Sequence, residues 1–93
     1  MMEETARKQV LRRLQSIEGH IRGIQRMVDE DTYCIETMKQ INAVQAALAK
    51  VNQLILENHL NTCVTTAIRG DEPTERERVL HEIADVFMMS SKV

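Results

Sequence analysis

Residues 32–68 contain neither glycine nor proline. Apolar residues recur in this stretch every three or four positions, which is the spacing of one face of an α-helix. At ~1.5 Å per residue, a helix over 32–68 is roughly 55 Å long. Its apolar residues are Ile35, Met38, Ile41, Val44, Leu48, Val51 and Ile55. Because a chain of 93 residues cannot cover so long a helix by itself, we expect two chains to pair their long helices.

A second helical pattern covers residues 4–28. It has the same three-four spacing, and its apolar residues are Val10, Leu14, Ile17, Ile21, Ile24 and Val28. Asp31 or Thr32 is expected to cap the long helix that follows, because short polar side chains accept hydrogen bonds from the free N–H groups of a first helical turn.

The residues after Gly70 predict a third helix. Glycine commonly ends a helix, and Thr74 and Glu77 have the spacing of a capping box. We expect this helix over about 74–89. The three patterns predict an all-α fold, with one helical domain over residues 1–93 and a long central helix. Antiparallel pairing of two such chains would give a four-helix-bundle dimer.

Charge is distributed unevenly along a chain of net charge −2. Basic residues outnumber acidic ones over residues 1–28, and acidic residues outnumber basic ones over 70–93. This pattern suggests a polarised surface, although on charge alone ordinary solvated helix faces are the preferred explanation. No apolar run has transmembrane length, and no signal-peptide core follows Met1–Glu4. We therefore expect a cytoplasmic protein without a membrane partner, whose two cysteines are free thiols or metal ligands.

His59 and Cys63 are spaced to share one metal ion. Residues four apart lie on one face of a helix, so an imidazole and a thiol at this spacing form half of a metal site. A buried cysteine beside a histidine with local hydrogen bonds is the alternative interpretation. Cys34 lies roughly 43 Å along the helix from Cys63. In an antiparallel pair, however, Cys34 of one protomer would approach His59 and Cys63 of the other, so the site would bridge two subunits.

Two thiolates and one imidazole form a soft donor set that selects Cu(I) or Zn(II). Zinc usually takes a fourth ligand, whereas His20 and His81 lie on other predicted helices. Three-coordinate Cu(I) therefore fits the donor count best. We expect His20 to be a packing or hydrogen-bonding residue. The six methionines are interpreted as core filling and chain ends.

The chain resembles the CsoR-type copper-sensing transcriptional repressors over nearly its whole length. The resemblance rests on the combination of Arg13-Leu14, Gly19-His20-Ile21-Arg22-Gly23-Ile24, Tyr33-Cys34, Lys39-Gln40-Ile41-Asn42-Ala43-Val44-Gln45 and Asn58-His59-Leu60-Asn61-Thr62-Cys63. It implies a three-helix protomer that forms a dimer and then a dimer of dimers. It also implies a repressor without a helix-turn-helix, whose apo form binds double-stranded operator DNA and whose Cu(I) form releases it.

The same resemblance implies residue roles. Cys34, His59 and Cys63 would ligate Cu(I), and Tyr33 and Glu82 would lie where the family hydrogen-bonds the metal-bound histidine. Arg13 and Lys50 match positions that contact DNA. Many relatives have arginine at the second position, and lysine offers a phosphate only a point charge.

Other inducers and functions remain alternatives. Nickel and cobalt sensors of this fold carry a histidine near the N-terminus, where this chain has Met2, Glu3 and Glu4. Formaldehyde sensors lack the second cysteine, and persulfide sensors lack the histidine. A thiol-based sensor and a copper buffer or chaperone are the remaining alternatives. We expect no enzyme and no small-molecule substrate, because neither a phosphate-binding glycine motif nor a third catalytic group accompanies the Cys–His pair.

Overall fold

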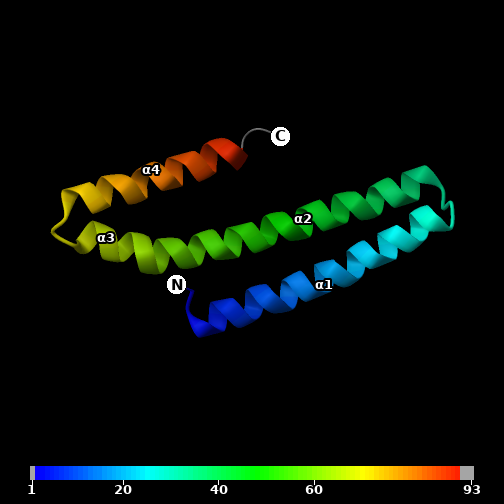
Figure 1. Cartoon of the computed structure of the whole chain (residues 1–93), viewed down its shortest axis with the longest axis horizontal. Coiled ribbons are helices and arrows are strands. Elements are labelled where there is room, and N and C mark those ends of the chain that lie inside the picture. The colour runs from blue at the N-terminus through cyan, green and yellow to red at the C-terminus, as the bar shows by residue number, and fades with distance from the viewer. Residues whose placement is uncertain (1, 91–93) are drawn as a thin grey trace.

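The computed structural model describes residues 2–90, and all of its regular elements are helical. Helix α1 spans Glu4–Asp29 and helix α2 spans Cys34–His59. A π-helical turn, η1, follows at Leu60–Val64 and leads into the short helix α3 at Thr65–Arg69. Helix α4, Pro73–Ser90, folds back along the end of this long rod (Figure 1). The predicted all-α protomer with a long central helix is confirmed.

Both predicted helix caps are wrong. Helix α2 begins at Cys34, with Tyr33 at its N-cap and no side-chain hydrogen bond there. Asp31 has φ 57° and forms part of the turn between α1 and α2. Short acidic side chains tolerate this left-handed conformation better than most. Helix α4 begins at Pro73, a residue suited to the first helical position because it has no N–H to satisfy, so Thr74 lies inside the first turn.

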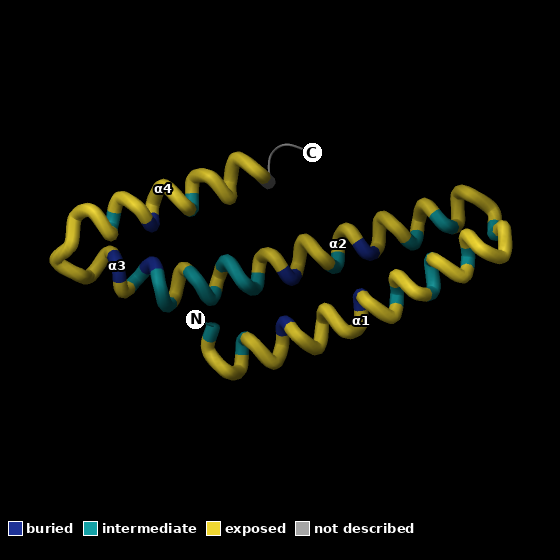
Figure 2. Tube along the Cα trace, in the orientation of Figure 1, coloured by how far each residue is buried: buried dark blue, intermediate teal, exposed yellow. Residues whose placement is uncertain are grey.

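Helices α1 and α2 form an antiparallel hairpin with a narrow core. Val10 and Ile17 of α1 pack against Val44 and Val51 of α2, and all four are buried. They come from the predicted apolar faces, at a helical spacing that turns them toward the partner helix. Figure 2 shows these buried positions as isolated dark segments along mostly exposed helices.

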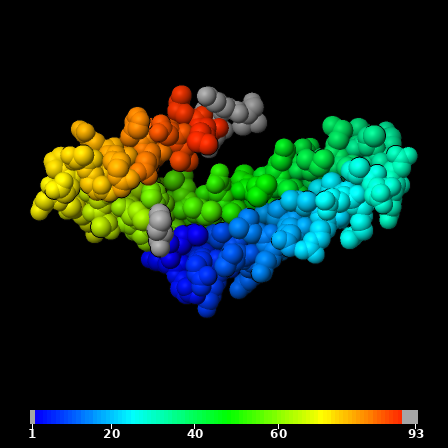
Figure 3. Space-filling view, in the orientation of Figure 1, coloured from blue at the N-terminus to red at the C-terminus, as the bar shows by residue number. Residues whose placement is uncertain are grey.

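A second cluster holds α4 in place. Val64 of η1, Ala67 of α3 and Val79 of α4 are buried together, with Ile83 packed against them. Because these contacts lie near the turn between α3 and α4, the last helix is attached close to one end of the molecule. The space-filling view shows α1 and α4 along opposite edges of an elongated body (Figure 3).

The protomer is too flat to bury its apolar residues. Its principal extents are 59 × 30 × 13 Å, so it is little thicker than one layer of helices. Its radius of gyration is 17.7 Å, whereas a compact domain of this length has about 12 Å. Half of the predicted apolar faces remains open, including Leu14, Ile21, Val28, Ile35, Met38, Ile41 and Leu48. An open apolar face of this size is typical of a surface that pairs with another protein.

A polar contact joins the two helices of the hairpin. The Nε2 atom of His20 on α1 lies 2.7 Å from Oε1 of Gln40 on α2, at a half-buried position. The prediction that His20 is a packing or hydrogen-bonding residue is confirmed. Because this bond crosses between helices, it fixes their relative register in a way that apolar contacts alone do not.

We expect Gln40→Ala to lower the free energy of unfolding by about 1 kcal/mol, since it leaves the half-buried His20 ring without its partner. Urea denaturation at a fixed chain concentration measures this effect. The control is Gln45→Ala, which changes the same residue type at an exposed position of α2. Equal effects of the two substitutions would contradict the assignment.

Candidate metal centre

His59 and Cys63 lie at the junction of α2 and η1. His59 is the last residue of α2 and Cys63 belongs to the π turn, and both are half-buried. They line one groove of about 250 Å³, together with Met2, Ile55, Asn58 and Thr62. The expectation that the i, i+4 spacing places both side chains on one side of the helix is therefore confirmed.

The π turn at Leu60–Val64 interrupts the predicted helix. The sequence pattern over 32–68 predicts one uninterrupted α-helix, which is wrong over these five residues. A π turn has wider i→i+5 hydrogen bonding and is frequent at functional sites. Here the irregular turn carries Cys63, which lines the same groove as His59.

Two threonine hydroxyls satisfy backbone carbonyls around the π turn. Thr62 Oγ1 donates to the carbonyl oxygen of Asn58 at 2.8 Å, and Thr65 Oγ1 donates to that of Leu60 at 2.6 Å. Thr62 Oγ1 also lies 3.6 Å from the Sγ atom of Cys63. Hydroxyls that bond back to the preceding turn compete with the regular helical ladder. This is the local signal, absent from apolar periodicity, that could have indicated the irregular turn.

Cys34 lies at the opposite end of α2. It is exposed and lines a separate groove of about 240 Å³ with Val28, Asp31, Thr37 and Met38 among its neighbours. Helix α2 has 26 residues, which separates Cys34 from His59 by roughly 38 Å. Within residues 2–90, no group of three or more His, Cys, Asp or Glu side chains could hold a metal ion. One chain thus brings His59 and Cys63 to one groove and leaves Cys34 at another.

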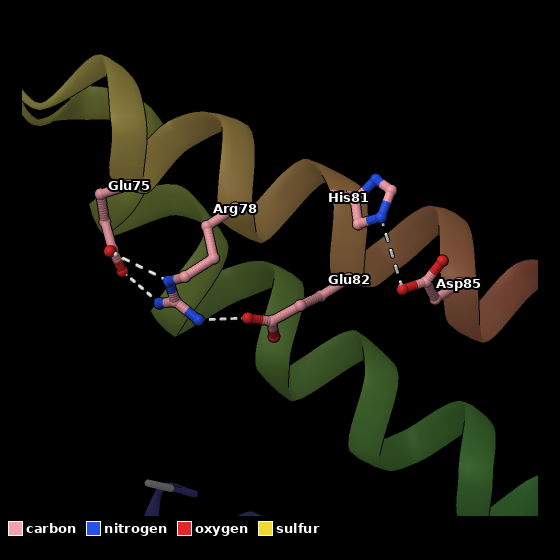
Figure 4. A network of polar contacts seen from close by, with 5 residues as sticks. All are labelled: Glu75, Arg78, His81, Glu82 and Asp85. Atoms are coloured by element: carbon pink, nitrogen blue, oxygen red, sulfur yellow. Dashed lines mark hydrogen bonds and ion pairs between the residues drawn. The ribbon is translucent and has the colours of Figure 1, made fainter.

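The two residues expected to support the histidine lie on different elements. Tyr33 precedes Cys34 and is 71% exposed. Glu82 of α4 accepts a hydrogen bond from Arg78, which also pairs with Glu75 (Figure 4). The hydrogen bond from Arg78 lowers the pKa of Glu75, and Glu75 in turn raises the pKa of Arg78. His59 also lines a second groove with Val86, one helical turn beyond Glu82, so α4 lies near the imidazole.

The predicted DNA-contacting residues lie on the hairpin. Arg13 lines a groove of about 420 Å³ with Arg12, His20 and Ala47. Lys50 is exposed one turn beyond Ala47, on the same side of α2. Within the part of the chain that the structure describes, carboxylates pair with Arg7, Lys8, Arg22 and Lys39, whereas Arg12, Arg13 and Lys50 form no ion pair. Their charge is available to an external anion.

Comparison with known proteins defines the class. The family model described as metal-sensitive transcriptional repressor matches residues 6–89. The chain therefore belongs to the metal-sensitive transcriptional repressor family. None of the helices in residues 2–90 is both long and apolar enough to cross a membrane.

Particular relatives are copper and nickel regulators. The copper-sensing transcriptional repressor CsoR of Mycobacterium tuberculosis is 49% identical over 67 residues, which is 71% of this chain and 56% of that protein. The chain thus spans little more than half the length of this relative. The crystal structure of CsoR with Cu(I) from Geobacillus thermodenitrificans matches 99% of this chain and 93% of its own, with a TM-score of 0.88 and 39% identity. The structure of the nickel-responsive transcriptional regulator InrS matches 86% of this chain and 90% of its own, with a TM-score of 0.75 and 40% identity.

We expect Thr62→Val to lower the free energy of unfolding by about 1 kcal/mol, because the carbonyl of Asn58 loses its hydroxyl donor at the π turn. Thr66→Val, at an exposed position in the next turn, is the control. Both are measured by urea denaturation. An unaltered midpoint for Thr62→Val would show that the hydroxyl does not support this turn.

Proposed function

We propose that this protein is a Cu(I)-responsive transcriptional repressor, whose apo form binds operator DNA and whose Cu(I) form releases it. The observation that carries the proposal is the separation of the donors. His59 and Cys63 share one groove, while Cys34 lines another at the far end of the same helix. A second copy of the chain, paired antiparallel, would bring Cys34 to the half-site of its neighbour.

The shape of the protomer supports this pairing. Half of the large apolar residues that are exposed within residues 2–90 lie along α1 and α2, which are the helices that an antiparallel dimer would bury, and most of the others lie on α4. Because these side chains are already partly buried, burial of the remainder of each contributes roughly 1 kcal/mol, and several of them together stabilise an association. Two chains would form two equivalent sites, as the twofold symmetry of a dimer requires. A dimer of dimers, with Cys34, His59 and Cys63 at each site, is the proposed assembly.

The donor set fits Cu(I). Two thiolates and one imidazole are soft ligands, and both grooves are large enough for one ion and its coordinating atoms. Cu(I) would supply a three-coordinate centre that ties one subunit to the other. The cysteines must be deprotonated and one nitrogen of His59 free, so the affinity for the metal would fall at low pH.

The second ring nitrogen of His59 could link the proposed metal site to α4 through a hydrogen bond. Glu82 uses Oε1 to accept a hydrogen bond from Arg78, which leaves Oε2 for another donor. We propose that Tyr33 and Glu82 hydrogen-bond this imidazole when its other nitrogen binds metal. The bond would draw α4 toward α2 in the metal form only, and would so distinguish two conformations.

DNA binding would use the basic groove of the hairpin. Four chains of net charge −2 carry −8 in total, so the cations must lie apart from the acidic residues of α4. Arg13 and Lys50 meet this requirement because no carboxylate within residues 2–90 pairs with them. They would bind phosphates, with Arg12 adjacent to Arg13 in the same groove.

Nickel is the second candidate inducer, because InrS is nickel-responsive and is 40% identical to this chain. Ni(II) prefers nitrogen and oxygen donors in square-planar or tetragonal arrangements. A set with two sulfurs and one nitrogen favours Cu(I). A copper buffer would have the same metal site but no affinity for DNA.

Stoichiometric Cu(I) is expected to weaken operator binding by about 5- to 150-fold, which corresponds to the usual coupling between two sites. Anaerobic fluorescence anisotropy with an operator duplex measures this change. Cys34→Ala is expected to retain apo DNA affinity and to lose the response to Cu(I). Unchanged affinity of the wild type with bound Cu(I) would exclude the repressor mechanism, and tight Cu(I) binding without any DNA binding would indicate a buffer.

Mixing two inactive variants tests whether the site bridges subunits. Cys34→Ala and Cys63→Ala homodimers each lack a complete site. A heterodimer of the two would regain one, since its Cys34 and its His59–Cys63 pair come from different chains. Random pairing would give about one tightly bound Cu(I) per four chains. No recovery after co-refolding would show that the donors do not meet between subunits.

Arg13→Ala and Lys50→Ala are each expected to weaken DNA binding and to reduce the slope of log K against log salt by about 1, because each removes one cation that neutralises a phosphate. Lys39→Ala is the control, because Glu36 already pairs with Lys39. Salt titrations of the three variants by anisotropy measure the slopes. A slope equal to that of the wild type in both test variants would remove these residues from the interface.

A further inference from the structure

A methionine lies against the His59–Cys63 pair. Met2, in the short segment before α1, lines the same groove of about 250 Å³ as His59 and Cys63. The antiparallel hairpin brings the start of α1 beside the last turns of α2 (Figure 1). Met2 is half-buried and packs against the core cluster of the hairpin. Met2 thus lines the groove while it packs against the core of the hairpin.

The thioether is chemically distinct from the other lining groups. Ile55 is apolar, and the hydroxyl of Thr62 already donates to the carbonyl of Asn58. The sulfur of methionine is a soft, neutral donor, which suits Cu(I) far better than Zn(II) or Ni(II). Because it is neutral, it would add a ligand without adding to the negative charge of two thiolates.

The charged residues that follow Met2 point elsewhere. Glu4 pairs with Arg7 and Lys8 on the outer surface of α1, with Oε1 of Glu4 2.7 Å and 3.9 Å from them. Glu3 is exposed and does not line the groove. Of the described residues before α1, Met2 alone reaches the candidate site, so hard carboxylate donors are kept away from it.

Building on the proposed function, we propose that Met2 Sδ is a further soft donor to Cu(I) at the His59–Cys63 half-site and that it increases selectivity for Cu(I) over Zn(II) and Ni(II). The site would then combine two thiolates, one imidazole and one weaker thioether. From the sequence, the methionines are interpreted as core filling and chain ends, and this proposal gives one of them, Met2, a second role as a metal ligand. Met2 does pack against the core, and its side chain also lines the groove of the two donors.

Copper K-edge X-ray absorption of protein labelled with selenomethionine tests this proposal directly. The cysteines keep their sulfur, so a copper–selenium path appears only if a methionine ligates the metal. We expect this path in the wild type and its loss in Met2→Leu. The control is Met27→Leu, which changes a half-buried methionine of α1 that lines neither half-site and should keep the path.

A competition titration gives a second measurement. Met2→Leu is expected to lower the affinity for Cu(I) by about tenfold, the lower end of the loss seen even for groups that only support a metal ligand. The affinity for Zn(II) should change less, because zinc in proteins is bound by thiolate, imidazole and carboxylate groups and not by thioethers. Equal losses for both metals would overturn the selectivity claim.

The outcomes separate this inference from the proposed function. A spectrum with two sulfurs, one nitrogen and no selenium would leave the Cys34–His59–Cys63 site intact and refute the role of Met2. Persistence of the selenium path in Met2→Leu and its loss in Met38→Leu would assign the thioether to the Cys34 groove instead, and would refute it as well. Absence of any copper–cysteine path would refute both the inference and the site on which it rests.

Discussion

The length of one helix governs the rest of this structure. Helix α2 is a stiff rod of 26 residues that holds Cys34 at one end and His59 at the other. Because a helix does not bend back on itself, no rearrangement within one chain brings these donors together. The proposed copper site therefore requires a second chain, and metal binding would act directly on the arrangement of two subunits. The protomer is flat and its apolar faces are half open, so the same pairing would complete both the core and the site.

The junction of α2 and η1 carries both the proposed metal ligands His59 and Cys63 and part of the second apolar cluster. The π turn carries Cys63, the hydroxyls of Thr62 and Thr65 satisfy its backbone, and Val64 anchors α4 through the second apolar cluster. A change in how His59 and Cys63 are held can therefore reach α4 through adjacent covalent structure. The hairpin carries the basic groove, and the bond between His20 and Gln40 joins its two helices. The proposed metal and DNA sites thus share helix α2, which can transmit a change between them.

Much of the fold was predictable because helices follow from the three-four spacing of apolar residues along the sequence. Apolar spacing indicated three helices, and the structure places their ends within a few residues of the expected positions, apart from the π turn. The pairing of His59 with Cys63 followed from the i, i+4 geometry, which survives the irregular turn. The cap of α2 was wrong because the turn at Asp31 adopts a left-handed conformation, and the cap of α4 was wrong because that helix begins one residue earlier, at Pro73. The position of Met2 in the groove of His59 and Cys63 was not predicted, since it depends on which helix end the segment before α1 meets in space.

The sequence by itself determined the helical class, the separation of Cys34 from His59 and Cys63 and the soft character of the proposed donors, because each depends only on residue type and on spacing along one helix. It also determined the family to which the chain belongs, since the matching residues extend over nearly all of it. The tertiary structure decided the π turn, the groove that Met2 shares with His59 and Cys63, and the bond between His20 and Gln40. The groove and the His20–Gln40 bond arise from contacts between segments far apart in the chain. The π turn is accompanied by local hydrogen bonds from threonine hydroxyls to backbone carbonyls. The spacing of apolar residues carries no information about either.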